Sequence, residues 1–271
     1  MVGEMYGMLR ALARIRVTIA YAAILTCVTT VLTAVGPGTR SHVIGHASTN
    51  LHNLSHGHLG TLFVSAFVID AGPVYVWLPG LICLLAVAEL IWRSGRLLIA
   101  FAVGHLGATL LVAVGLTAAV ELGWMSTDVT RATDVGMSYG ASAVLGALTA
   151  AVPRRWRPAW TGWWLAAAAA VVVMGRDFTD VGHAAALMLG MLAATRFGQA
   201  DRWTTLRWVL LVVGAGFGYL MLTNGGVTVA VATGAGLSGA AIAEAAVGRR
   251  RGRDEAARPV GTGCALTPGI A

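Results

Sequence analysis

The chain has 271 residues, of which 57% are hydrophobic and only 11% charged. Stretches of about 20 apolar residues, the length that crosses a bilayer of about 30 Å, recur along most of the sequence. This composition excludes a soluble globular enzyme and predicts an all-α polytopic membrane protein. The formal charge of +7 comes from arginines in short clusters between the apolar stretches. Such clusters indicate topology, so we expect no nucleic-acid partner.

Eight apolar stretches predict eight transmembrane helices. The first is as long as a spanning helix and has no clear cleavage site, so we expect it to stay in the membrane. Residues 248–271 are rich in arginine, glycine and proline, which predicts a disordered tail. The eight predicted helices cover residues 15–36, 74–92, 97–121, 136–152, 160–175, 179–197, 204–223 and 226–247.

The segment 37–73, between the first two helices, is too polar to cross the membrane alone. It nevertheless has an apolar side, so we expect a loop that lies on or dips into the outer leaflet. His52 and His56 have the i, i+4 spacing of a helical metal site, but no acidic or cysteine neighbour completes it. Solvated histidines are therefore favoured, and no metal is expected. The segment holds five of the seven histidines: His42, His46, His52, His56 and His58.

Arginine clusters occur in alternate loops, which predicts the topology. The positive-inside rule places these loops and both termini in the cytoplasm, and it places the loop around Asp128 outside. The protein is thus expected to be a multi-pass protein of the cell membrane, with the lipid bilayer as its surroundings. The clusters are Arg10, Arg14 and Arg16, Arg93 and Arg96, Arg154, Arg155 and Arg157, Arg196, Arg202 and Arg207, and Arg249, Arg250, Arg251 and Arg253.

Ser138 and His183 lie near the starts of two predicted helices that begin on the same side of the membrane. Ser138 is about two residues inside its helix and His183 about three, so their depths differ by about 2 Å at about 1.5 Å per residue. A nucleophile and its base need such matched depth. The alternative is that both are interior polar residues that bond between helices.

Several short motifs follow one another in an order that resembles the rhomboid intramembrane serine proteases, in particular a divergent, actinobacterial-type rhomboid-like group. The resemblance covers roughly residues 15–197 as a six-helix core. We therefore expect a rhomboid-like core over 1–203, extra C-terminal transmembrane helices over 204–247, and the tail after them. The motifs are Thr61-Leu62-Phe63-Val64-Ser65-Ala66-Phe67, Glu89 with Gly95, Val135-Gly136-Met137-Ser138 with Gly146, and Gly182-His183 with Gly190.

The resemblance implies hydrolysis of a peptide bond inside or beside the membrane by a serine–histidine dyad. Ser138 would be the nucleophile and His183 the base, and Asp180, one turn before His183, could orient the ring. Transmembrane proteins would be the substrates, and no cofactor is implied.

Two departures from the family pattern keep other functions open. Tyr139 follows the serine, where the family pattern has glycine. The places that usually supply an oxyanion histidine and asparagine fall near Pro73 or Val74 and near Trp77, which do not donate as those residues do. A catalytically inactive rhomboid-like protein that binds transmembrane clients is the alternative. A small-solute transporter is less favoured, because few acidic residues approach helix interiors, namely Glu89, Glu121 and Glu244.

The last predicted helix contains a literal Gly-x-Ser-Gly, Gly236-Leu237-Ser238-Gly239. Ser238 would lie about 18 Å along its helix and His183 only about 5 Å along its own, so they are not expected to share a site. These glycines instead predict close helix packing.

Overall fold

The computed structural model describes residues 12–69, 74–175, 177–200 and 202–256, and no strand occurs among them. Six of the described helices are long and apolar enough to cross a membrane. Each of the eight predicted transmembrane stretches corresponds to a helix over most of its described length. The structure therefore confirms an all-α polytopic membrane protein. Pro73 and residues 257–271 of the predicted tail lie outside the described residues.

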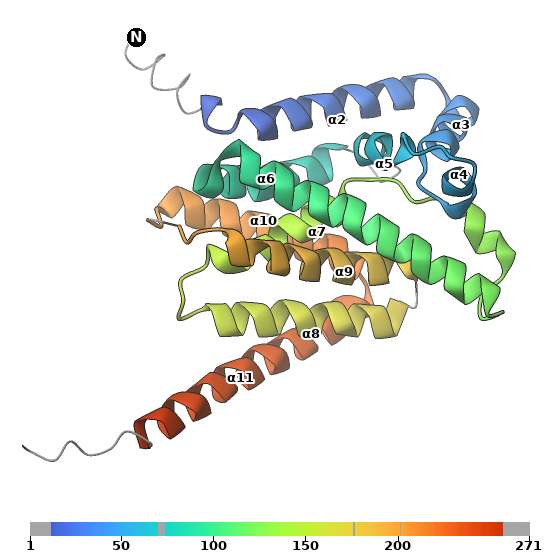
Figure 1. Cartoon of the computed structure of the whole chain (residues 1–271). Coiled ribbons are helices and arrows are strands. Elements are labelled where there is room, and N and C mark those ends of the chain that lie inside the picture. The colour runs from blue at the N-terminus through green and yellow to red at the C-terminus, as the bar shows by residue number, and fades with distance from the viewer. Residues whose placement is uncertain (1–11, 70–73, 176, 201, 257–271) are drawn as a thin grey trace, which may run out of the picture.

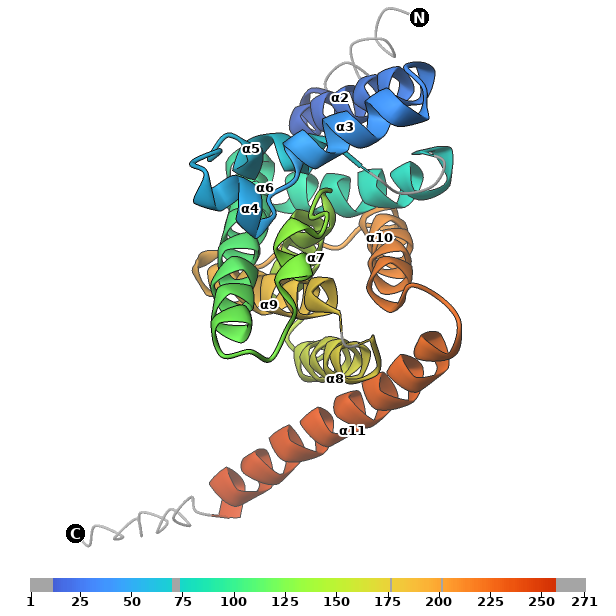
Figure 2. The same ribbon diagram turned by 90° about the vertical axis from the view of Figure 1, so that its right-hand side faces the viewer.

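Most of the long helices lie side by side in Figure 1, with α2 along one side of the bundle, while α11 crosses α8 at an angle and extends away from the bundle (Figure 2). Short helices occur in the described part of the segment between α2 and α6. The long helices are α2 (Arg16–Ala34), α6 (Val74–Glu121), α8 (Arg157–Gly175), α9 (Phe178–Ala193), α10 (Thr205–Thr223) and α11 (Val227–Ala256), with the shorter α7 (Ser138–Ala147) among them. The short elements are α3 (Pro37–Ala47), α4 (Leu51–Ser55), α5 (Thr61–Val64), η1 (Ser65–Phe67), η2 (Thr127–Arg131), η3 (Leu148–Ala150) and η4 (Ala194–Arg196).

Helix α7 occupies the centre of the bundle, and Figure 2 shows it among α6, α9 and α10. Every residue from Tyr139 to Ala147 is buried. The helix is rich in alanine and glycine, whose small side chains let three neighbours approach it at once. Its ten residues span about 15 Å, half the thickness of the hydrocarbon core. At least one end of α7 must therefore be enclosed by the other helices and must not reach the membrane surface.

The second and third predicted helices are joined in α6 by a sharp kink at Arg93. Arg93 has φ 68° and ψ 168°, a non-helical conformation inside the helix. This region of backbone space belongs almost entirely to glycine and costs other residues about 1–3 kcal/mol. The sequence resemblance had placed the glycine of this turn at Gly95, which is helical in the structure. The strained turn residue is therefore an arginine.

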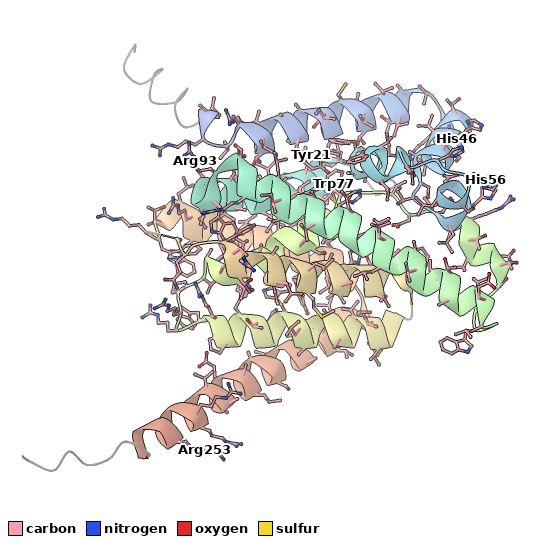
Figure 3. The ribbon with its side chains drawn as sticks, in the orientation of Figure 1. Tyr21, His46, His56, Trp77, Arg93 and Arg253 are labelled. Atoms are coloured by element: carbon pink, nitrogen blue, oxygen red, sulfur yellow. The ribbon has the colours of Figure 1, made fainter. Side chains whose placement is uncertain are left out.

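Arg93→Gly should stabilise the protein by about 1 kcal/mol or more, because glycine adopts the observed backbone conformation without strain. The exposed Arg93 side chain, labelled in Figure 3, contributes little packing that could offset this gain. Thermal unfolding in detergent micelles measures the difference. The matched control is Gly95→Ala, where a Cβ would meet nothing within 4 Å. A midpoint for Arg93→Gly at or below wild type would show that the kink carries no strain.

The arginine-bearing loops gather at one end of the bundle (Figure 1). Two long-range hydrogen bonds tie them together there: Arg207 Nη2 donates to the Leu90 carbonyl at 2.9 Å, and Trp92 Nε1 donates to the Gly198 carbonyl at 2.7 Å. Helices α3 and α4 and the turn after α6 lie at the opposite end (Figure 1). This grouping agrees with the predicted alternation of loops. Which end faces the cytoplasm stays a prediction.

The two C-terminal helices pack on different partners. In α10, a Cβ at Gly214 would collide with the backbone of Leu84, so α10 lies directly against α6. In α11, Gly239 lies against the backbone of Gly162, which confirms close packing as the role of that glycine. Ser238 donates to the Gly234 carbonyl at 2.9 Å on its own helix. Helix α11 continues to Ala256, so residues 248–256, expected in the disordered tail, extend the helix instead.

Candidate active site

The start of α7 depends on the backbone freedom of Gly136. Gly136 has φ 124°, a value that residues with a Cβ rarely adopt, and its N–H donates to the Ser65 carbonyl at 2.8 Å. The chain turns here into Met137, the N-cap, and Ser138, the first residue of α7. The glycine two residues before the serine is thus required by the geometry of the turn.

The segment 37–73 holds the residues just before α7 in place. The Thr49 N–H donates to the Asp134 carbonyl at 2.9 Å, and the Asp134 N–H donates to the Ser48 hydroxyl at 2.8 Å. These contacts join the short α3–α4 connection to the polypeptide leading into Ser138. The segment, which was expected to be a loop, is therefore largely helical where it is described and is part of the site's framework.

His105, on α6, holds the same segment in place through hydrogen bonds. Its Nε2 lies 3.1 Å from the Leu62 carbonyl and 3.2 Å from the Ser65 hydroxyl. Because a carbonyl only accepts, Nε2 carries the proton and donates to Leu62. His105 thus positions the segment and does not serve as a base for Ser65. Nothing in the sequence pointed to this partner.

Helices α7 and α9 touch at backbone distance. A Cβ on Gly146 of α7 would overlap the Leu187 carbonyl oxygen, and a Cβ on Gly190 of α9 would overlap the Ala143 carbonyl oxygen. Both glycines belong to the motifs that resemble the rhomboid serine and histidine helices. Their close approach brings the first half of α9, with His183, beside the start of α7.

His183 is buried, with 6% of its surface exposed, and neither ring nitrogen has a hydrogen-bond partner. Its neighbour on α7 is Tyr139, whose ring meets the imidazole edge-on with centroids 5.3 Å apart. The Tyr139 ring also lies over Gly182, where a Cβ would collide with it. The side of α7 that faces α9 is therefore occupied by a phenol.

The expected hydrogen bond between Ser138 and His183 is not formed in this structure. Ser138 precedes Tyr139 by one residue, and successive helical residues point about 100° apart, so the tyrosine takes the direction toward α9. Asp180 does not bond His183 either. Its carboxylate instead lies against Gly175 at the end of α8, where a Cβ would overlap it.

Three polar atoms are left unpaired at this contact: both His183 nitrogens and the Tyr139 hydroxyl. Each buried polar atom without a partner costs about 1–3 kcal/mol, and folded proteins leave few of them. A cluster of such atoms marks a place where an arriving polar group would be stabilised. It is the strongest local argument that this contact has a function.

Acidic residues surround the Tyr139 hydroxyl at the loop end of the site. The Asp134 carboxylate faces the hydroxyl without the geometry of a hydrogen bond, and Asp177 and Asp180 act on it electrostatically. Burial raises the pKa of Asp134 to about 6. Asp134 has no distinguishing signal in the sequence, because an aspartate in a polar turn resembles an ordinary solvated residue.

The raised pKa of Asp134 predicts a pH dependence of stability. The folded state holds a proton that the unfolded state releases near pH 4, so the free energy of unfolding should fall as pH rises from about 4 to about 6. Asp134→Asn should flatten this slope and match or exceed wild type at pH 7. Thermal unfolding at several pH values measures both, with the exposed residue in Asp128→Asn as the control. An unchanged slope in Asp134→Asn would contradict the assignment.

The places predicted for the oxyanion donors hold apolar or aromatic residues in the structure. Val74 is the first residue of α6, and Trp77 packs against the main hydrophobic core. Across the described part of the chain, no three histidine, cysteine, aspartate or glutamate side chains are close enough to share a metal ion.

Comparison with known families adds one finding. A family model described as "Rhomboid-like protein" matches residues 12–197. Comparisons with curated proteins and with solved structures gave no match. The matched region begins just before α2, ends after η4, and contains both Ser138 and His183. The chain therefore belongs to the rhomboid-like protein family.

Proposed function

We propose that the chain is an intramembrane serine protease that cleaves transmembrane proteins, with Ser138 as nucleophile and His183 as general base. The observation that carries the proposal is the buried His183 ring with two unpaired nitrogens beside the start of α7. A buried imidazole without partners is costly to maintain, whereas a base must keep one nitrogen free for the proton it receives.

The proposed reaction needs a local change of side-chain positions. Ser138 must come within about 3 Å of a His183 nitrogen, and the Tyr139 ring, which packs against His183, must move aside to admit it. Ser138 Oγ would then attack the scissile carbonyl while His183 takes its proton. His183 would return the proton to the leaving amine. His183 would then take a proton from a water molecule that attacks the acyl-serine, and would return it to the Ser138 oxygen as the carboxylic acid leaves.

A second function is supported by the position of Tyr139. A ring packed on Gly182 and His183, together with Val74 and Trp77 at the expected oxyanion places, fits a protein that binds transmembrane clients without cleaving them. Loss of one oxyanion donor typically lowers the rate about 10²–10³-fold. The two functions share the fold and differ in whether Ser138 is reactive.

A serine-reactive fluorophosphonate probe distinguishes the two functions. If the chain is a protease, the probe should label the wild-type protein and should not label the Ser138→Ala variant. Tyr139→Gly should increase labelling, because it removes the ring that packs against His183. Tyr139→Phe is the matched control, since it keeps the ring and removes only the hydroxyl. Absence of labelling in wild type and in Tyr139→Gly would favour the client-binding protein.

We also propose that the protein lies in the cell membrane with both termini in the cytoplasm, since the arginine-bearing loops share one end of the bundle. In a cysteine-free background, an impermeant thiol reagent added outside should modify a cysteine at Asp128 and spare one at Arg155. The reverse pattern would invert the topology.

A further inference from the structure

Two pairs of histidines have the same ring spacing on the segment that frames the site. His42 and His46 lie one turn apart on α3, and His52 and His56 lie one turn apart on α4 and its C-cap. The ring centroids are 4.3 Å apart in both pairs. Side chains at i and i+4 share one helix face, so both rings of each pair can reach one small ion.

The second ring of each pair has a defined tautomer. His46 Nδ1 lies 2.9 Å from the His42 carbonyl, and His56 Nδ1 lies 2.7 Å from the His52 carbonyl. Because a carbonyl only accepts, Nδ1 carries the hydrogen and Nε2 keeps its lone pair. A metal-binding histidine commonly donates its other ring N–H to a backbone carbonyl in this way.

The rings are accessible. His42, His46 and His56 are exposed and His52 is half-buried, and Figure 3 shows His46 and His56 at the same end of the molecule. No group of three or more ligating side chains occurs in the described ranges, so the two pairs are separate. Each pair would supply two imidazole ligands, and water would complete the coordination.

We infer that each histidine pair binds one divalent transition-metal ion of the kind that imidazole prefers, with Cu²⁺ bound more tightly than Zn²⁺. The sequence alone favours solvated histidines, because acidic and cysteine ligands are missing from it near these pairs. The repeated ring spacing and the two Nδ1 hydrogen bonds, which the sequence does not show, reverse that preference.

A bound ion would link the two histidines of one pair and so hold one helical turn of each short helix in place. Helix α4 has only five residues and α3 eleven, lengths at which an isolated helix is marginal. A metal ion that binds the helical turn, and does not bind the unfolded segment, stabilises the turn. The connection between the two helices carries Ser48 and Thr49, which hold Asp134 before α7. Metal would therefore order the framework of the Ser138 site, whether or not the protein is a protease.

The test uses the full-length protein without an oligohistidine tag, titrated with CuCl₂ and separately with ZnCl₂ by calorimetry. We expect two bound equivalents in wild type. The double variants His42→Gln/His46→Gln and His52→Gln/His56→Gln should each retain one equivalent, and the fourfold variant should retain none. Electron paramagnetic resonance of bound Cu²⁺ should show coupling to imidazole nitrogens. His58→Gln is the control, because His58 is exposed and has no histidine one turn away.

Two results would overturn the inference. One is a stoichiometry in wild type that the double variants leave unchanged, which would place the ions elsewhere. The other is that the His58→Gln control loses a bound metal equivalent while the variants of the two pairs do not. That result would assign the site to a different set of rings. The single variants His46→Gln and His56→Gln change one exposed ring each and should each lose one equivalent. Their metal-free unfolding midpoints verify that the loss does not reflect misfolding.

Discussion

Alanine at Ser138 and alanine at His183 should reduce cleavage of a helix-unstable transmembrane substrate equally, each by about 10⁴-fold or more. A nucleophile and its base act as one unit, so removing either removes the whole step, and the double variant should be no slower than either single variant. Single-turnover cleavage in proteoliposomes measures the rate. A much smaller loss in His183→Ala than in Ser138→Ala would mean that another group takes the serine proton.

Two other serines provide matched controls for the nucleophile. Ser238 belongs to the literal Gly-x-Ser-Gly, but its hydroxyl donates to the Gly234 carbonyl and it is exposed on α11. Ser142 lies one turn deeper than Ser138 on α7 and is buried. Ser238→Ala and Ser142→Ala should keep cleavage and probe labelling. Labelling that persists in Ser138→Ala and disappears in Ser142→Ala would move the nucleophile one turn along the helix.

The helices were predictable because the membrane imposes a single requirement on every spanning segment. About 20 apolar residues must follow one another, and this pattern is visible without knowledge of the packing. The predicted stretch 204–223 and the observed α10, Thr205–Thr223, differ by one residue for that reason. The prediction was poorer for α7, where predicted residues 136–152 became a ten-residue helix and a 3₁₀ turn. A helix enclosed by others need not span the bilayer.

The framework of the candidate site was only partly predictable. The roles of Gly136, Gly146 and Gly190 were predictable, because a glycine within these motifs indicates a turn or a close approach of helices from its residue type alone. The direction of Tyr139 was not predictable, because it depends on which face of α7 meets α9. The contacts of His105 with Leu62 and of Thr49 with Asp134 join residues far apart in the chain. Periodicity contains no information about such pairs.

Glu89 shows how an acidic residue inside a helix bundle can be misread. As a sequence feature it was one of three acidic residues considered for a transport path. In the structure it is buried, with 1% of its surface exposed, and its carboxylate accepts from the N–H groups of Val17 and Thr18 at 3.0 and 2.8 Å. The Thr18 and Ser94 hydroxyls each donate to it at 2.7 Å. Glu89 therefore caps the first turn of α2, which has no cap from its own N-cap residue.

Glu89→Ala should destabilise the protein by about 3 kcal/mol or more, one of the largest effects expected of any single change outside the dyad. The substitution leaves four donors without an acceptor in a buried site and removes a negative group from the positive end of a helix. Glu89→Gln should cost less, about 1–2 kcal/mol, because the amide oxygen still accepts from part of the set.

The matched control is Glu121→Gln, an exposed glutamate at the end of the same helix, which should change stability by no more than about 0.5 kcal/mol. Thermal unfolding in detergent micelles compares the three variants. Protease sensitivity near residue 16 then separates the capping role from general packing, because loss of the cap should loosen the first turn of α2 before the rest of the bundle. If Glu89→Gln and Glu121→Gln unfold alike, the carboxylate is not the cap of α2, and Glu89 would again be a candidate for a transport path.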